Sequence, residues 1–291
     1  MLLRKIYKVA DHLFAVNANE ALLAQMTQYE PFLVEQADGP LVFELTVVAD
    51  EPFPATDITV ETSQDDDGSQ IVAGHTADGL SYFEYLLWGD RSARVLATPD
   101  YRQARVWTES HELFGVNNAL MVMFALATAD KGTALFHSAI VGHEGHGYMF
   151  LGKSGTGKST HARLWLRYVS GSELVNDDNP VVRVFPDGAV VYGSPWSGKT
   201  PCYRNMSLPL GGIVLLSQAP YNKIERLRSI AAYAAIVPSI SGKRWDTAVA
   251  DGLHETENQL AMRVPVWHLD CLPNEAAARL CQETIENSIS V

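Results

Sequence analysis

The sequence predicts an α/β protein with a mixed β-sheet core, preceded by a small antiparallel β-rich module. Three observations predict this fold class. Residues 1–105 consist mostly of short segments rich in β-branched residues and separated by turn signals. A glycine-rich loop at 152–160 lies between an apolar strand and an amphipathic helix. Hairpins flank this loop, whereas a regular alternation of strand and helix would build a parallel sheet. We therefore expect two domains, at 1–105 and 106–291.

The composition is that of a globular protein. The 291 residues are 47% hydrophobic and 19% charged, and no apolar run approaches the length of a membrane span. The formal net charge of −12 disfavours nucleic acid as a partner, because an acidic chain repels a phosphate backbone. There are three cysteines without a C-x-x-C spacing, and polar residues directly follow Met1-Leu2-Leu3. These features favour a cytoplasmic protein with reduced thiols and no signal peptide.

Strand-like segments make up the expected N-terminal module. The clearest are 41–48, 58–62 and 81–88, which are rich in β-branched and aromatic residues. The acidic run at 65–67 precedes Gly68 and is interpreted as a hairpin tip, with a metal site as the less favoured alternative. An almost continuously apolar segment at 111–127 then predicts a buried helix. No motif in the module itself indicates chemistry.

The most specific pattern is the loop Gly152-Lys153-Ser154-Gly155-Thr156-Gly157-Lys158-Ser159-Thr160, which matches G-x-x-x-x-G-K-[ST]. Glycines let the backbone N–H groups approach phosphate oxygens, and the following helix directs its positive end at them. Lys158 can reach the β- and γ-phosphates, and the Ser159 hydroxyl can ligate Mg²⁺. The loop therefore predicts binding of a nucleoside triphosphate with magnesium. The residues assigned to this binding are Gly152, Ser154, Gly155, Thr156, Gly157, Lys158, Ser159 and Thr160.

A hairpin leads into this loop, with a strand at 133–141, a turn at 142–147 and a second strand at 148–151. If the turn centres between residues 144 and 145, His137 pairs across from Gly152, beside the mouth of the loop. His137 is therefore a candidate catalytic residue, with a structural role equally open. His143 and His146 are three residues apart in a glycine-rich turn, which does not match the helical H-E-x-x-H zinc motif.

Paired carboxylates follow the next predicted strand. The segment 173–180 indicates a short strand that ends in Asp177 and Asp178. Beside a phosphate-binding loop, one carboxylate can hold the metal and the other can accept the proton of an attacking hydroxyl. A hairpin is expected next, at 181–193. Lys199 and Arg204 are candidates for contact with the transferred phosphoryl group, and a role as plain surface charges remains open.

Three motifs together resemble the C-terminal catalytic domain of HPr kinase/phosphorylase, whose fold is similar to the nucleotide-binding core of phosphoenolpyruvate carboxykinase. They are Phe136-His137-Ser138, the loop through Thr160, and Leu174-Val175-Asn176-Asp177-Asp178. The resemblance implies an ATP-dependent kinase that phosphorylates a serine hydroxyl. It implies that Lys158 contacts the phosphates and that Ser159 and Asp178 hold Mg²⁺. It also makes Asp177 the base and places His137 near the reacting phosphate. Members of the family often form oligomers, so a homo-oligomer is compatible with the resemblance.

The chain departs from the family pattern in two places. Thr160 stands where the family has Glu, and Gly193-Ser194-Pro195-Trp196-Ser197-Gly198-Lys199 replaces the family's Leu-Glu-Ile-Arg-Gly signature. We therefore expect a kinase with a different hydroxyl acceptor, which is a protein, a peptide or a small molecule. Two alternatives stay open, namely a carboxykinase-like enzyme acting on a small acid and a non-catalytic nucleotide sensor. The preference between ATP and GTP also stays open.

Overall fold

The chain divides into two compact units, Met1–Thr128 and Ala129–Val291. The computed structural model describes residues 1–198 and 200–289. The boundary between the units falls later than residue 105, where the sequence analysis placed it. The reason is that the buried helix α2 (Glu112–Ala127) packs on strands of the first unit. No helix in the described part of the chain is long and apolar enough to cross a membrane.

The first unit is built around a β-sheet with the strand order β3-β1-β2-β4-β9-β8-β7-β6-β5. Its elements, besides α2, are β1 (Leu3–Val9), β2 (His12–Ala18), α1 (Glu20–Gln25), the 3-10 helix η1 (Thr27–Phe32), β3 (Leu33–Val34), β4 (Leu41–Val48), β5 (Ile58–Asp66), β6 (Ser69–Thr76), β7 (Ser81–Leu87), β8 (Asp90–Ala97) and β9 (Gln103–Thr108). Most neighbours are antiparallel, but β4 pairs in parallel with both β2 and β9. The expectation of an antiparallel module is therefore wrong at these two pairs.

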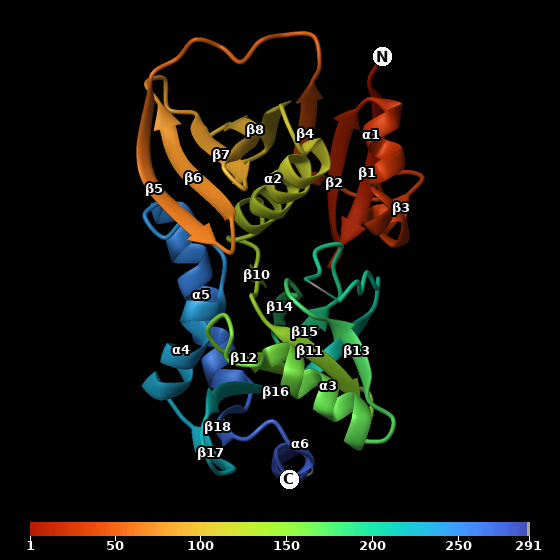
Figure 1. Cartoon of the computed structure of the whole chain (residues 1–291), viewed down its shortest axis with the longest axis vertical. Helices are drawn as coiled ribbons and strands as arrows, with labels where there is room; N and C mark the ends of the chain where they lie inside the picture. The colour runs from red at the N-terminus through yellow and green to blue at the C-terminus, as the bar shows by residue number, and fades with distance from the viewer. Residues whose placement is uncertain (199, 290–291) are drawn as a thin grey trace. The chain divides into compact units, whose positions relative to one another are not determined.

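Helix α2 supplies much of the first unit's core, because it lies across β4, β7, β8 and β9 (Figure 1). Phe124 on this helix is fully buried and meets the ring of Phe14 from β2 edge-on. Gly115 lets the helix approach β8 closely, since a Cβ atom at this position would lie 2.6 Å from Cβ of Ala93. The sequence is locally consistent with this packing, because the helix is apolar almost all round and therefore suited to burial.

The second unit contains the other mixed sheet. Its elements are β10 (Thr133–Leu135), β11 (Ala139–His143), β12 (His146–Leu151), α3 (Lys158–Tyr168), β13 (Glu173–Asn176), β14 (Val181–Phe185), β15 (Gly188–Tyr192), β16 (Ser207–Gln218), β17 (Lys223–Leu227), α4 (Ile230–Ile236), the 3-10 helix η2 (Val237–Ser239), α5 (Thr247–Arg263), β18 (Val266–Cys271) and α6 (Glu275–Ile289). The strand order is β10-β14-β15-β16-β12-β11-β13, and β18 pairs with both β16 and β17.

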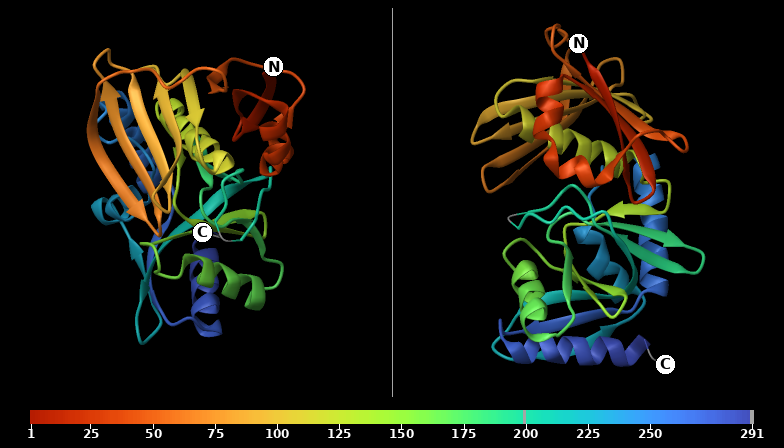
Figure 2. Two further views of the ribbon diagram at one scale, coloured as in Figure 1. Left: turned by 45° about the horizontal axis from the view of Figure 1, so that its top comes forward. Right: turned by 90° about the vertical axis from the view of Figure 1, so that its right-hand side faces the viewer.

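Parallel and antiparallel pairs coexist in this second sheet, so the predicted mixed sheet is confirmed. Strand β16 runs parallel to β12 and to β18, whereas the hairpins β11–β12 and β14–β15 are antiparallel. Helices α3 and α6 contact each other and cover one face (Figure 2). There Trp165 of α3 and Ile285 of α6 share a buried cluster with Phe150 of β12. This packing anchors the strand that leads into the glycine-rich loop.

The strand expected at 133–141 is interrupted in the structure. Strand β10 ends at Leu135, and β11 begins at Ala139. Between them, the N–H groups of Phe136 and Ser138 donate to the carbonyl groups of Pro180 and Asp178, at 3.0 and 2.9 Å. The backbone hydrogen bonds of 136–138 thus go to distant segments, and local sequence alone does not reveal this break.

We predict that Gly115→Ala destabilises the protein by about 1–3 kcal/mol, because the added methyl group forces α2 away from β8. Urea denaturation followed by circular dichroism measures the free energy of unfolding. The matched control is Gly39→Ala, where the new Cβ would meet only Cδ1 of Leu13, at 3.8 Å. Equal stability of the two variants would contradict the close packing of α2 on the first sheet.

Candidate functional site

The glycine-rich loop connects β12 directly to α3, as the sequence predicts. Strand β12 ends at Leu151 and α3 begins at Lys158. Gly155 and Gly157 have φ values of +77° and +110°, which glycine adopts at little cost and other residues rarely adopt. Inside the loop, the N–H of Thr156 donates to the carbonyl of Lys153 at 3.1 Å and closes a turn. The amino end of α3 follows at once, where the helix dipole favours a bound anion.

Lys158 lies in the first turn of α3 and is buried, whereas the neighbouring Ser159 is half-buried. Its Nζ atom donates to the carbonyl oxygens of Gly152 at 2.9 Å and Lys153 at 3.4 Å. The ammonium group therefore folds back over the start of the loop. A phosphate oxygen is a stronger acceptor than a neutral carbonyl, because the hydrogen bond is then charge-assisted on both sides.

The topology brings the second acidic element to the same edge of the sheet as the loop. Strand β13 is antiparallel to β11, and β11 is antiparallel to β12, so β13 and β12 run in the same direction. Ile140 of β11 pairs with Asn176 on one side and with Met149 on the other. Asn176, the last residue of β13, is therefore level with Met149, two residues before the end of β12. The two strands are two strand spacings apart, which is roughly 10 Å. The loop follows one strand, and Asp177 follows the other.

The two adjacent carboxylates have different surroundings. Asp177 is 8% exposed, and its Oδ1 atom finds no hydrogen-bond partner among residues 1–198 and 200–289. Asp178 has a side chain that is 31% exposed, and its Oδ2 atom accepts a hydrogen bond from Nδ2 of Asn179 at 2.8 Å. Asn176 holds the turn by accepting the N–H of Asp178 and donating to the carbonyl of Trp196. One carboxylate is thus enclosed and the other is open to solvent.

His137 lies beside this acidic turn. The register of β11 against β12 runs from Ala139↔Phe150 to His143↔His146, which confirms the turn centre between residues 144 and 145. The ladder ends before His137, whose N–H donates instead to the carbonyl of Ser239 at 2.7 Å. Its Nε2 atom lies 3.9 Å from Oδ1 of Asp178, and its side chain is 45% exposed. The structure therefore brings His137 and Asp178 together.

Arg204, one of the two basic candidates, does not lie at this edge. The guanidinium group of Arg204 donates to the carbonyl of Leu174 and to Glu173, both at 2.7 Å, near the start of β13. Asp177 lies beyond the opposite end of that strand. A role for Arg204 in phosphoryl contact therefore has no geometric support, and its bonds are structural. Lys199, the other candidate, lies outside the described residues.

His143, on the β11–β12 hairpin, has a structural environment. Its Nδ1 atom is 2.5 Å from Oε1 of Glu286, and its Nε2 atom is 3.0 Å from the carbonyl oxygen of Ser170. Glu144 also lies close enough to form a possible ligand set with His143 and Glu286. Because both ring nitrogens already face oxygen atoms of the protein, the ring is placed to tie the hairpin to α6 rather than to offer a lone pair to a cation.

Gln218 contacts the loop and was not identified from the sequence. It is the last residue of β16, and its Nε2 atom donates to the carbonyl oxygens of Gly155 at 3.1 Å and Thr156 at 3.3 Å. The one local signal was the position of Gln218 just after the apolar run 212–216. That signal does not specify which loop the side chain reaches.

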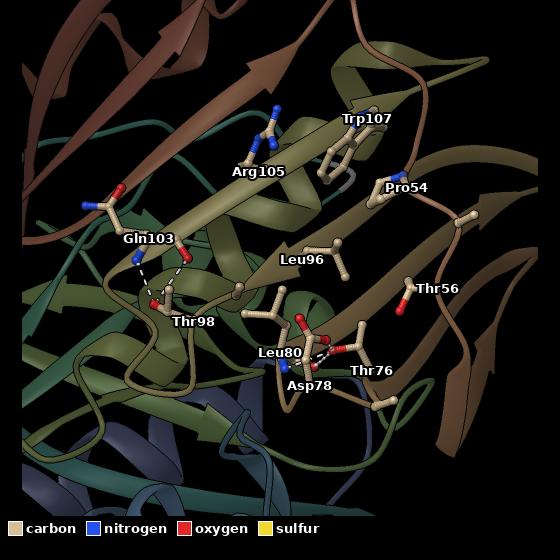
Figure 3. A pocket seen from close by; sticks show the side chains of 13 residues that line it. Pro54, Thr56, Thr76, Asp78, Leu80, Leu96, Thr98, Gln103, Arg105 and Trp107 are labelled. Atoms are coloured by element: carbon tan, nitrogen blue, oxygen red, sulfur yellow. Dashed lines mark hydrogen bonds between the residues drawn. The ribbon is translucent and has the colours of Figure 1, made fainter.

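The first unit contains a pocket of about 540 Å³ with a mostly apolar lining, including Leu96 and Trp107 (Figure 3). A segment around Pro54 passes over one end of it, and Gln103 lies at the other end (Figure 3). Arg105 also lines the pocket, and its guanidinium group forms an ion pair with Glu51 at 2.6 Å. The pocket belongs to a different unit from the loop and presents no comparable set of acids and cations.

His161 is a buried residue of α3, the helix that follows the loop. It is 2% exposed, and its Nε2 atom accepts a hydrogen bond from Nε1 of Trp165 at 3.2 Å. The ring also meets Phe150 of β12 edge-on. Burial lowers the pKa of His161 to about 4, so the ring is neutral at physiological pH.

We predict that His161 makes stability depend on pH. Between pH 6.5 and about 4 the unfolded chain binds a proton at this residue and the folded protein does not, so lowering the pH favours unfolding. The free energy of unfolding falls by up to about 1.4 kcal/mol per pH unit in that window. His161→Gln removes this slope in denaturation measured from pH 4.5 to 7, whereas His146→Gln retains it. Identical slopes in wild type and His161→Gln would contradict the burial of a neutral ring.

Comparison with known proteins finds likeness among solved structures only. No family model and no curated protein matches the chain. Among solved structures, the chain is similar to the Hpr(Ser) kinase/phosphatase from Coxiella burnetii, with 13% sequence identity and a TM-score of 0.30. The match covers 52% of this chain and 98% of that chain. A likeness at this level carries no argument for activity, so the functional interpretation depends on the geometry of the second unit.

Proposed function

We propose that this chain is an ATP- and Mg²⁺-dependent phosphotransferase that phosphorylates a hydroxyl group, with the serine of a protein or peptide as the favoured acceptor. The observation that carries the proposal is the enclosed carboxylate of Asp177 at the sheet edge where the glycine-rich loop lies. A loop of this sequence and conformation suits a row of phosphates. A carboxylate oxygen without a donor has free lone pairs for an incoming proton.

In the proposed reaction, the acceptor oxygen attacks the γ-phosphorus while the bond to the β-phosphate oxygen breaks. Asp177 accepts the proton of the acceptor hydroxyl, and ADP leaves. Lys158 moves from the carbonyls of Gly152 and Lys153 to the phosphate oxygens and neutralises their charge. His137 stands beside Asp178 and can donate a hydrogen bond to the transferred group.

The residues at the site fit a magnesium ion. Mg²⁺ takes oxygen ligands and retains several waters, and it is commonly held by one or two carboxylates together with phosphates. The Ser159 hydroxyl and the partly exposed Asp178 carboxylate are ligands of this kind. When bound, the ion would neutralise charge on the phosphates. Asp178 would therefore bind the metal, while Asp177 remains available to accept the proton of the acceptor hydroxyl.

The alternatives have less support. A carboxykinase-like reaction on a small acid needs arginines that are free to bind carboxylates. Arg204 is bonded to Glu173, and the guanidinium group of Arg226 lies 4.7 Å from the ring centre of Trp267. A nucleotide sensor would need the loop but no base, and the enclosed Asp177 supports an enzyme instead. Transfer to a defined acceptor separates the kinase from the sensor.

We predict that Asp177→Asn lowers phosphoryl transfer by about 10²–10⁴-fold and leaves ATP binding within about twofold of wild type. The amide is almost the same size as the carboxylate, but it cannot take the proton. Radiolabelled ATP with a panel of serine-containing peptides, proteins and small alcohols identifies the acceptor, and the rate on that acceptor is then compared between variants.

The matched control is Asp187→Asn, in the exposed turn between β14 and β15, which should transfer at the wild-type rate. Full activity of Asp177→Asn would show that the assigned base is wrong. Tight ATP binding by wild type without transfer to any acceptor in the panel would favour the sensor.

A further inference from the structure

We propose that Gln218 is a positioning residue that holds the phosphate-binding loop in its binding conformation before the nucleotide arrives. The inference concerns the same loop and therefore rests on the proposed function. Its basis is the pair of hydrogen bonds from Nε2 of Gln218 to the carbonyl oxygens of Gly155 and Thr156, at 3.1 and 3.3 Å. These bonds link the loop to a residue that is 62 and 63 positions away in sequence from the two loop residues.

The sheet places Gln218 where it can make these bonds. Strand β16 runs parallel to β12, with Leu151 paired to Leu215. Gln218 therefore lies three residues beyond Leu215, the last residue of β16 that pairs with β12, and is level with the middle of the loop. Side chains alternate along a strand, so Gln218 and Leu216 share one face, and Leu216 packs in the cluster under α3. The adjacent Ser217 is on the other face, where its hydroxyl contacts Nε2 of His268 at 2.8 Å.

Holding a carbonyl group also fixes the N–H group of the next residue. In a trans peptide unit the C=O of one residue and the N–H of the following residue point in opposite directions. The bond to the Thr156 carbonyl therefore sets the direction of the Gly157 N–H. The bond to the Gly155 carbonyl likewise sets the Thr156 N–H, which closes the turn onto Lys153. Gly155 and Gly157 are conformationally permissive, so these peptide units rotate easily without such a restraint.

The contribution of Gln218 is preorganisation. Its amide touches carbonyl oxygens, and in the Thr156–Gly157 peptide unit the N–H that points the opposite way is the one that would face phosphate. Gln218 therefore acts through the loop and makes no contact with the reacting atoms. A loop that is ordered in advance loses less conformational freedom when the ligand binds, and its dipoles are already aligned.

Two substitutions separate the hydrogen bonds from the packing of the side chain. Gln218→Met keeps a flexible chain of similar length but has no donor. Gln218→Lys restores a donor within reach of the two carbonyl oxygens. Hydrogen–deuterium exchange of residues 153–157 in the nucleotide-free protein measures the order of the loop directly, and calorimetric titration with Mg²⁺ and ATP measures the dissociation constant.

We expect Gln218→Met to raise both the exchange rate of the loop amides and the dissociation constant by about fivefold, which corresponds to one net hydrogen bond. Gln218→Lys should return the exchange rate to that of wild type. Ser217→Ala is the matched control on the same strand, and it should leave loop exchange unchanged.

Wild-type exchange in Gln218→Met, or exchange in Gln218→Lys that stays as fast as in Gln218→Met, would overturn the assignment. Failure of the proposed function gives a different result, because the wild type would then either not bind ATP or bind it without transfer to any acceptor. The exchange measurement in the nucleotide-free protein still decides the role of Gln218 in that case.

Discussion

The register of the β11–β12 hairpin is the constraint on which the arrangement of the second unit depends. The pairing of Ala139 with Phe150 sets where β12 ends and the glycine-rich loop begins. The same strand β11 also pairs with β13, and so fixes the level of the acidic turn. A slip of one residue would turn every side chain of β12 to the opposite face, and Phe150 would lose its place in the core under α3. Burial of this strand therefore protects the geometry of the site.

Two neighbouring carboxylates, for which we propose separate roles, lie in different environments because of the way the chain folds around them. Asp177 follows the last residue of β13 and is enclosed, and Asp178 turns toward solvent and His137. Asn176 bonds the N–H of Asp178 and the carbonyl of Trp196, which keeps the two carboxylates in different environments. An enclosed carboxylate suits acceptance of a single proton, whereas an open one can share a hydrated metal ion. The proposed difference in role thus rests on backbone geometry rather than on residue type.

Local features of the second unit were predictable from the sequence, and features that depend on distant partners were not. Glycines and apolar runs indicated the loop, its strand and its helix. The turn centre considered from the sequence, between residues 144 and 145, is the one that the structure shows. The break at 136–138 arises because backbone groups there bond to Pro180 and Asp178, far along the chain. The sequence made Arg204 a candidate phosphate ligand, whereas in the structure its guanidinium group donates to Glu173 and Leu174. Contacts between residues that are distant in sequence can be identified only once the fold is known.

The most direct test of the central claim is calorimetric titration of ATP with Mg²⁺ into the wild type, Lys158→Ala and Arg204→Ala. We expect binding by the wild type and a loss of measurable binding in Lys158→Ala. Arg204→Ala should keep the wild-type affinity, because the guanidinium group of Arg204 binds Glu173 at the far end of β13. Absence of binding by the folded wild type, or equal affinity in Lys158→Ala, would contradict the assignment of residues 152–160 as a nucleotide site.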